Sequence, residues 1–268
     1  NGVLQGGPMY FIIEGLGKSW KPLAVMFSVC GLVGALPVFN VNQLTQAING
    51  ILWTPNGVEI VLTSNLIIGL VLVTLTAVVI LGGIGRISKI ASKMVPSMVL
   101  LYFMVVLIIL AVNFEVVPKY LALIFTDAFA ADNFKGDAFF GGLVGGLILL
   151  GVKRGAFSNE AGIGTAPLAH GAAKTNEPVR EGLVAMLGPA IDTLLVCTLT
   201  ALAILVTGVW ETSSDNGVSL TAAAFAAAMP GYGSYLLLLC IAVFSISSLF
   251  SFSYYGTKCL SFLIGADK

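Results

Sequence analysis

Long apolar stretches recur from one end of this chain to the other and limit what it can fold into. Of its 268 residues, 57% are hydrophobic and 10% are charged, whereas about 25% are charged in a typical soluble domain. A bilayer core of about 30 Å is crossed by about 20 apolar residues of α-helix, and continuous runs favour helices over alternating membrane strands. The sequence therefore predicts an all-α, polytopic membrane protein with one transmembrane domain over 1–268. Its long candidate spans are 22–48, 61–81, 94–112, 182–208 and 231–257.

A sixth apolar stretch, residues 138–151, is shorter and rich in glycine. As an unbroken helix it would be about 21 Å long, too short for the bilayer core. Glycines permit unwinding, and unwound backbone near the membrane midplane can bind a substrate or an ion in transporters. Close helix packing at small residues is the alternative. We expect a broken span here, with its glycines at Gly141, Gly142, Gly145 and Gly146.

Positive charges are distributed unevenly over the loops that six spans would create. Of the 13 lysines and arginines, all except Lys119 and Lys135 fall on one side if 138–151 crosses the membrane. Cytoplasmic loops are enriched in Lys and Arg, so this side is expected to be cytoplasmic. We therefore expect a multi-pass protein of the plasma membrane, in a bacterial inner membrane, with residues 1–21 and 258–268 in the cytoplasm. The first residue is Asn1 and not Met, and we expect an internal fragment of a longer protein.

Several function classes lack support in the sequence. There is no basic block that would favour nucleic acid as a partner, and the four cysteines have neither metal-site nor disulfide spacing. "GIGTAP" and "GGIGR" do not follow a strand as a phosphate-binding loop would, and His170 has no metal-spaced partner. No Ser/His/Asp set can be nominated. We expect no catalytic residues, no enzyme activity and no cofactor.

Polar side chains inside the candidate spans are candidates for a binding site. Asn40 is the deepest of several amides in the first span, just after a kink expected at Pro37. Ser245, Ser248 and Ser251 share one face of the last span, and serine hydroxyls suit sodium, a hard cation that prefers oxygen ligands. Interhelical hydrogen bonds for the amide, and bonds to their own backbone for the serines, are the alternatives.

Asp192 is the single charged residue placed inside a span. An intramembrane charge costs several kcal/mol unless it is paired or hydrated, so such a residue is a functional candidate by default. Two roles remain open for Asp192, part of an ion pathway or a structural acceptor for neighbouring polar groups. Pro189, three residues earlier, predicts a local distortion of the helix.

Two stretches carry a resemblance to a known family. They are "GGPMYFIIEGLGK" at 6–18 and "GVKRGAFSNEAGIGTAPLAHGAAKTNEPVREGLVAMLG" at 151–188. Together with "ILGGIGRI" and "SYYGTKCL", they resemble the sodium:alanine (alanine or glycine:cation) symporter family, part of the amino acid-polyamine-organocation superfamily. The resemblance implies the leucine-transporter-like fold of two inverted five-helix repeats, of which the six spans would be helices three to eight.

The resemblance also implies sites. Sodium in this fold is held partly by hydroxyls of the eighth helix, which match Ser247 and Ser248, and the broken sixth helix matches "FFGGLVGG". Substrate would be bound at five residues, of which Asn40, Leu143 and Phe252 are smaller than the family's usual side chains. We therefore hypothesise a pocket that admits amino acids larger than alanine or glycine. The five substrate-binding candidates are Asn40, Gly141, Gly142, Leu143 and Phe252.

The segment Ser158, Asn159 and Glu160 follows Lys153 and Arg154, which are expected at the cytoplasmic face. We therefore interpret it as an inner gate loop and not as the substrate pocket; a re-entrant dip into the membrane and a merely structural loop are the alternatives.

The leading function is sodium-coupled symport of a small neutral amino acid of the alanine or glycine class, by alternating access across the bilayer. The expected partners are that amino acid, Na⁺ and lipid. Two alternatives remain, a proton- or other cation-coupled carrier of the same fold with Asp192 titrating, and a passive channel or sensor.

Overall fold

The computed structural model describes residues 6–129 and 143–265, and in this part of the chain the regular structure is entirely helical. The predicted all-α class is therefore confirmed for the described residues. The inverted-repeat assignment stays a prediction. The shorter elements are α1 (Pro8–Leu16), η1 (Lys18–Trp20), α6 (Val117–Ala128), α9 (Ala166–His170), α12 (Val209–Thr212) and α13 (Val218–Ala228).

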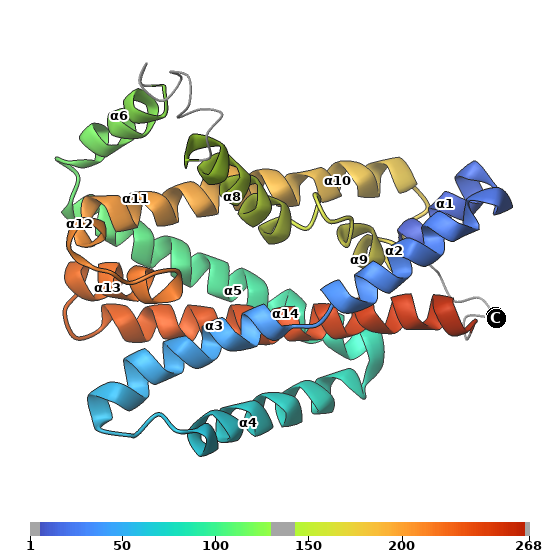
Figure 1. Ribbon diagram of the computed structural model, residues 1–268, viewed down its shortest axis with the longest axis horizontal. Helices are drawn as coiled ribbons and strands as arrows, with labels where there is room; N and C mark the ends of the chain where they lie inside the picture. Colours follow the sequence, from blue (N-terminus) through green and yellow to red (C-terminus); the bar gives the residue numbers. More distant parts are fainter. Residues whose placement is uncertain (1–5, 130–142, 266–268) are drawn as a thin grey trace.

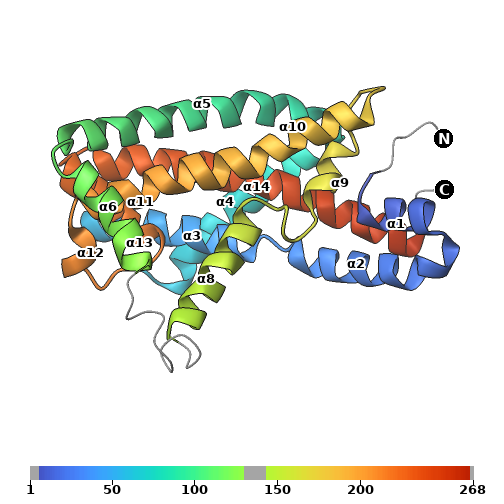
Figure 2. The same cartoon turned by 90° about the horizontal axis from the view of Figure 1, so that it is seen from above.

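Within the described residues, five helical stretches are long and apolar enough to cross a membrane. Each of the five long stretches expected from the sequence lies mostly within one of them, as in an integral, polytopic membrane protein. Figures 1 and 2 show these helices running roughly alongside one another. They are Lys18–Asn56 (α2, Lys21–Gly34; α3, Val38–Ile48; η2, Asn49–Trp53; η3, Thr54–Asn56), Leu62–Ile80 (α4), Gly85–Val112 (within α5, Gly83–Val112), Pro178–Val206 (α10, Pro178–Ala190; η5, Ile191–Cys197; α11, Thr198–Val206) and Gly233–Ile264 (α14).

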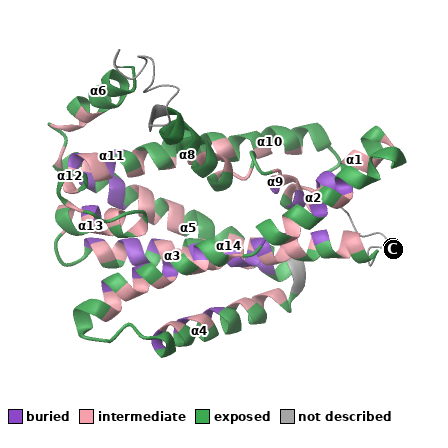
Figure 3. Cartoon of the chain, viewed as in Figure 1, coloured by how far each residue is buried: buried purple, intermediate pink, exposed green. Residues whose placement is uncertain are grey.

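Helix α14 forms the centre of the bundle. It contacts α2, α3, α4, α5 and α13, and it contributes to both of the larger buried apolar clusters. Burial follows this arrangement, because α14 carries many buried residues whereas α4 and α10 are largely exposed (Figure 3). Exposed apolar side chains on a helix of spanning length are suited to lipid. The buried serines of α14, Ser245 and Ser247, therefore sit among other helices and not on the apolar periphery.

Prolines interrupt the long helices where the sequence predicted it. Helix α2 ends at Gly34 and α3 begins at Val38, on either side of the kink expected at Pro37. Pro189 lies in α10, and the helix continues from Ile191 as a π-helical segment, η5. Proline lacks the N–H that would bond to the preceding turn, and π-helical turns are frequent at functional sites. The expected distortion next to Asp192 is therefore present.

Helix α8 (Leu143–Ser158) differs from the sixth span expected at 138–151. Gly141 and Gly142 lie outside the described residues, whereas Gly145 and Gly146 lie inside regular helix. The helix continues through Lys153 and Arg154, which are exposed on it, and it ends only at Ser158. A non-helical turn, 159–165, then leads to the short α9. Among the described residues, the helix is interrupted after Ser158 and not at Gly145 and Gly146.

Candidate functional site

The turn after α8 has a backbone that few residues adopt. Glu160 has a φ of 58° and Gly164 has a φ of 74°, so both backbones lie in the left-handed region. A non-glycine residue at positive φ is costly and persists only where surrounding contacts hold it. One such contact is local, since the Asn159 side-chain oxygen accepts a hydrogen bond from the Ala161 backbone N–H at 3.1 Å. The turn is therefore a built feature of the fold.

Two hydrogen bonds join this turn to the π-helical segment. The Ser158 hydroxyl donates to the Asp192 carboxylate at 2.7 Å, and the Asn159 amide donates to the Thr193 hydroxyl at 3.3 Å. Asp192 lies at the midpoint of the helical stretch Pro178–Val206 and is half-buried. The end of α8 therefore meets the middle of a helix of spanning length.

These contacts bear on the segment Ser158, Asn159 and Glu160, whose role as an inner gate loop stays a prediction. The sequence placed it at the cytoplasmic face, because it follows Lys153 and Arg154 so closely. In the structure it contacts the midpoint of Pro178–Val206 and not the end at Pro178. Lys153 and Arg154 belong to α8 itself, which continues for about one more turn to Ser158.

Glu160 ties the same turn to the central helix. Its carboxylate accepts a hydrogen bond from the Thr165 hydroxyl at 3.0 Å and another from the Tyr255 hydroxyl of α14. Thr165 and Tyr255 are both buried. Hydrogen bonds to a charged acceptor are roughly twice as strong as those between neutral groups, so they can hold Glu160 in its left-handed backbone.

Three aromatic rings from three different helices meet beside the break. Phe157 of α8 lies 5.6 Å from Phe39 of α3 and 6.3 Å from Phe252 of α14, measured between ring centroids. Phe252 is buried and also contacts Tyr255, at 6.0 Å. The sequence prediction included Phe252 but missed Phe39 and Phe157. Their position next to Asn40 and Ser158 in the chain was the available signal.

The other predicted site residues are placed as follows. Asn40 is buried on α3, one residue after Phe39. Leu143 is the first residue of α8, and its side chain lies outside the description. Ser247 is buried and its hydroxyl donates to the Phe244 carbonyl at 2.8 Å, whereas Ser248 is half-buried. The structure thus brings Asn40, Phe252 and the two serines into the bundle around α14.

A cavity of about 540 Å³ connects two of the predicted ion-site residues. It lies between α5, the π-helical segment and α14, and both Asp192 and Ser247 line it. Most of the lining is apolar, with Tyr102 of α5 among the polar exceptions. Its volume falls in the range of small-molecule sites, about 300 to 1,000 Å³. A carboxylate and a hydroxyl from different helices therefore face one space.

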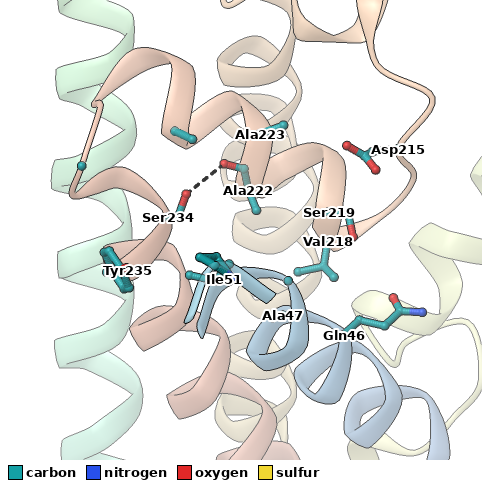
Figure 4. A pocket seen from close by; sticks show the side chains of 14 residues that line it. Gln46, Ala47, Ile51, Asp215, Val218, Ser219, Ala222, Ala223, Ser234 and Tyr235 are labelled. Carbon is teal, nitrogen blue, oxygen red and sulfur yellow. Dashed lines mark hydrogen bonds between the residues drawn. The ribbon is translucent and has the colours of Figure 1, made fainter. Parts of the chain in front are cut away.

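A second cavity, of about 410 Å³, lies at the end of the bundle where α3, α13 and α14 meet. Figure 4 shows alanine side chains along its wall, with Gln46 and Asp215 toward one side. Asp215, its charged lining residue, is exposed and accepts a hydrogen bond from Ser213 at 2.8 Å. Ser234 donates to the Ala222 carbonyl at 3.5 Å. These polar groups lie at the rim or are bonded to the protein.

Helices of spanning length around a broken helix, with a carboxylate and hydroxyls at mid-length, define an integral membrane protein built like a transporter. The chain belongs to the sodium:alanine symporter family, because the sequence model of that family matches residues 1–268. The family resemblance stated from the sequence is therefore confirmed, and the family is one of transporters.

Curated relatives agree with this family over nearly the whole chain. The sodium/alanine symporter AgcS of Methanococcus maripaludis is 42% identical over 99% of the chain and 57% of its own length. The probable sodium/glutamine symporter GlnT of Bacillus subtilis is 34% identical over 98% of the chain and 52% of its length. The sodium/proton-dependent alanine carrier protein of Bacillus sp. PS3 is 30% identical over 96% of the chain and 57% of its own length. The chain therefore spans about half the length of these relatives.

Proposed function

We propose that the protein containing this chain is a symporter that couples sodium to the transport of a small neutral amino acid across the plasma membrane. The observation that carries the proposal is the junction at the helix break, where the Ser158–Asp192 hydrogen bond lies in the middle of a helix of spanning length. Backbone interruptions at mid-membrane are where transporters of this architecture bind substrate and ion. Alternating access would expose this junction to each side of the membrane in turn.

The substrate site proposed here joins the residues expected from the sequence with the residues at the break. Phe157 and Phe252 would supply an apolar wall, and the buried amide of Asn40 would supply a polar contact. Gly141 and Gly142, which lie outside the described residues, and Leu143 at the start of α8 remain proposed contacts. Ser158, Asn159 and Glu160 are proposed to form the edge of the site, since Ser158 bonds to Asp192 and Asn159 bonds to Thr193.

Sodium is proposed to bind near the two serines of α14. Ser247 and Asp192 line the same cavity, and sodium prefers oxygen ligands of the kind that hydroxyls and a carboxylate provide. The relatives named sodium/alanine symporter and probable sodium/glutamine symporter support sodium as the coupling ion. The name of the second relative also supports substrates larger than alanine.

The decisive experiment is sodium-driven uptake of alanine by the full-length protein in proteoliposomes. Ser247→Ala and Ser248→Ala are expected to raise the sodium concentration for half-maximal uptake several-fold. Ser253→Ala is the matched control, because Ser253 lies on the same helix and its hydroxyl bonds to the Leu249 carbonyl. Uptake by the wild-type protein that ignores sodium would refute the proposal.

One observation favours a second candidate, a carrier coupled to protons. Asp192 is a half-buried carboxylate that lines a cavity and could bind a proton in place of sodium. The relative named sodium/proton-dependent alanine carrier supports this reading. Uptake that follows a pH gradient without sodium, and that is lost in Asp192→Asn, would favour it.

A further inference from the structure

His170, the single histidine of the chain, ends α9 and contacts the next helix. Its Nδ1 lies 2.7 Å from Oε1 of Glu181 on α10. Both side chains are partly exposed, 38% for His170 and 27% for Glu181. The contact closes over the connecting segment 171–177, and it joins the short helix after the break to the long helix that continues into the segment with Asp192.

Helix α9 has few means of holding its own position. With five residues it is too short to be stable alone, because a first helical turn costs more conformational entropy than it gains. Leu168 anchors it by packing, fully buried in a cluster with Met9 and Cys259. The His170–Glu181 contact is its polar anchor at the other end.

The position of α9 affects the turn after α8 through a hydrogen bond. Thr165 directly precedes α9, and its hydroxyl bonds to Glu160, which in turn accepts from Tyr255. A shift of α9 relative to α10 would therefore move the donor that helps to hold Glu160 in its left-handed backbone. The His170–Glu181 contact acts on the proposed site through this chain of bonds, without touching substrate.

We propose that His170 and Glu181 are positioning residues for the broken helix, and that protonation of His170 tightens α9 against α10. Neutral imidazole can donate one ordinary hydrogen bond from Nδ1, whereas imidazolium donates a stronger, charge-assisted one to the carboxylate. Histidine changes charge in the physiological pH range. Because alternating access requires the halves of the bundle to move, an acidic pH on the side facing His170 slows transport. The proposal rests on the proposed symport function.

The surrounding elements carry other charged groups. Glu177, at the end of the connecting segment, pairs with Arg180 of α10 at 3.5 Å, and both are mostly exposed. The connecting segment carries Lys174, and α14, which packs on α9, carries Lys258 near the Tyr254 ring. Among the described residues, Glu181 is the carboxylate that the structure places against His170.

The test uses the full-length protein in proteoliposomes of defined orientation, with the pH varied only on the side facing His170. Sodium-driven alanine uptake by the wild type is expected to fall about threefold from pH 7.5 to 5.5, since a charged hydrogen bond exceeds a neutral one by enough for a change of that size. His170→Gln and Glu181→Gln are expected to give flat pH profiles. Glu177→Gln is the matched control and is expected to keep the wild-type profile. A wild-type profile in His170→Gln would overturn the proposal.

A second measurement does not depend on transport. Hydrogen exchange of the peptides covering 159–171, corrected for the intrinsic effect of pH, is expected to slow at least threefold at pH 5.5 relative to 7.5 in the wild type. The change is expected to be absent in His170→Gln. Equal pH dependence in both proteins would contradict the positioning role. A wild type that shows this exchange effect but no sodium-driven uptake at pH 7.5 would refute the symport function and leave the positioning role supported.

Discussion

The Ser158 hydroxyl donates a 2.7 Å hydrogen bond to the Asp192 carboxylate and so ties the last residue of α8 to the middle of the helical stretch Pro178–Val206. An ionised carboxylate at this depth costs several kcal/mol unless it is compensated. A hydroxyl offers one donor and no positive charge, and the carboxylate has further acceptor sites. Asp192 is thus bonded to Ser158 and has acceptor sites left for a cation.

Asp192→Asn is expected to raise the sodium concentration for half-maximal uptake about tenfold or more, a loss of about 1.4 kcal/mol or greater in ion binding. Thermal stability should change little, because the amide oxygen can still accept from Ser158. Uptake assays over a sodium series, paired with melting curves in detergent, provide the measurement. Asp215→Asn, at an exposed carboxylate bonded to Ser213, is the control and should behave as wild type. Unchanged sodium dependence in Asp192→Asn would exclude the carboxylate from the ion site.

Phe157→Ala is expected to broaden substrate selection. Removing this ring takes away its contacts with Phe39 and with Phe252 and enlarges the space beside the break. Glutamine, leucine and methionine should then compete with alanine uptake at concentrations several-fold lower than for the wild type. Phe125→Ala, on the exposed face of α6, removes an equal ring far from the break in sequence and should not alter competition. An unchanged competition series in Phe157→Ala would place the substrate elsewhere.

Tyr255→Phe tests how firmly the turn is held to α14. The change removes the hydroxyl that donates to Glu160 and keeps the buried ring against Phe252. Leaving an acceptor short of a partner costs about 1 to 3 kcal/mol when it is buried, and Glu160 is half-buried, so the melting temperature in detergent should fall. Tyr254→Phe removes a hydroxyl from the adjacent, half-buried residue and is the comparison. Equal melting temperatures for the two variants would show that the Tyr255 bond contributes nothing to stability.

The sequence predicted the long helices because apolar length is a local property that a bilayer imposes on each span separately. It also predicted the distortions at Pro37 and Pro189, since proline removes a backbone donor wherever it occurs. The partners of Ser158 were not predictable in the same way. Lys153 and Arg154 suggested a loop but lie inside α8, and nothing in the local sequence pairs Ser158 and Asn159 with the π-helical segment.

The aromatic contacts illustrate the same limit. Phe39, Phe157 and Phe252 are separated by more than a hundred residues at their extremes, and nothing in their local patterns links them. Their meeting depends on how α3, α8 and α14 pack, which is a property of the whole bundle. Glu160 likewise gives no sign in the sequence of its left-handed backbone, whereas Gly164 does, because glycine is the residue that adopts this conformation without cost.

Gly164→Ala makes the backbone requirement of the turn measurable. The φ of 74° at this position is strained for alanine by about 1 to 2 kcal/mol, while an added Cβ would find only ordinary contact, 3.5 Å from the Phe27 ring. A lower melting temperature would therefore report the backbone and not a clash. Gly182→Ala is the matched control, because Gly182 lies inside α10 with nothing within 4 Å of an added Cβ. That change should leave stability equal or raise it by up to about 1 kcal/mol, as expected for alanine in a helix. If Gly164→Ala melts at the same temperature as Gly182→Ala, the left-handed turn after the break is not a requirement of the fold.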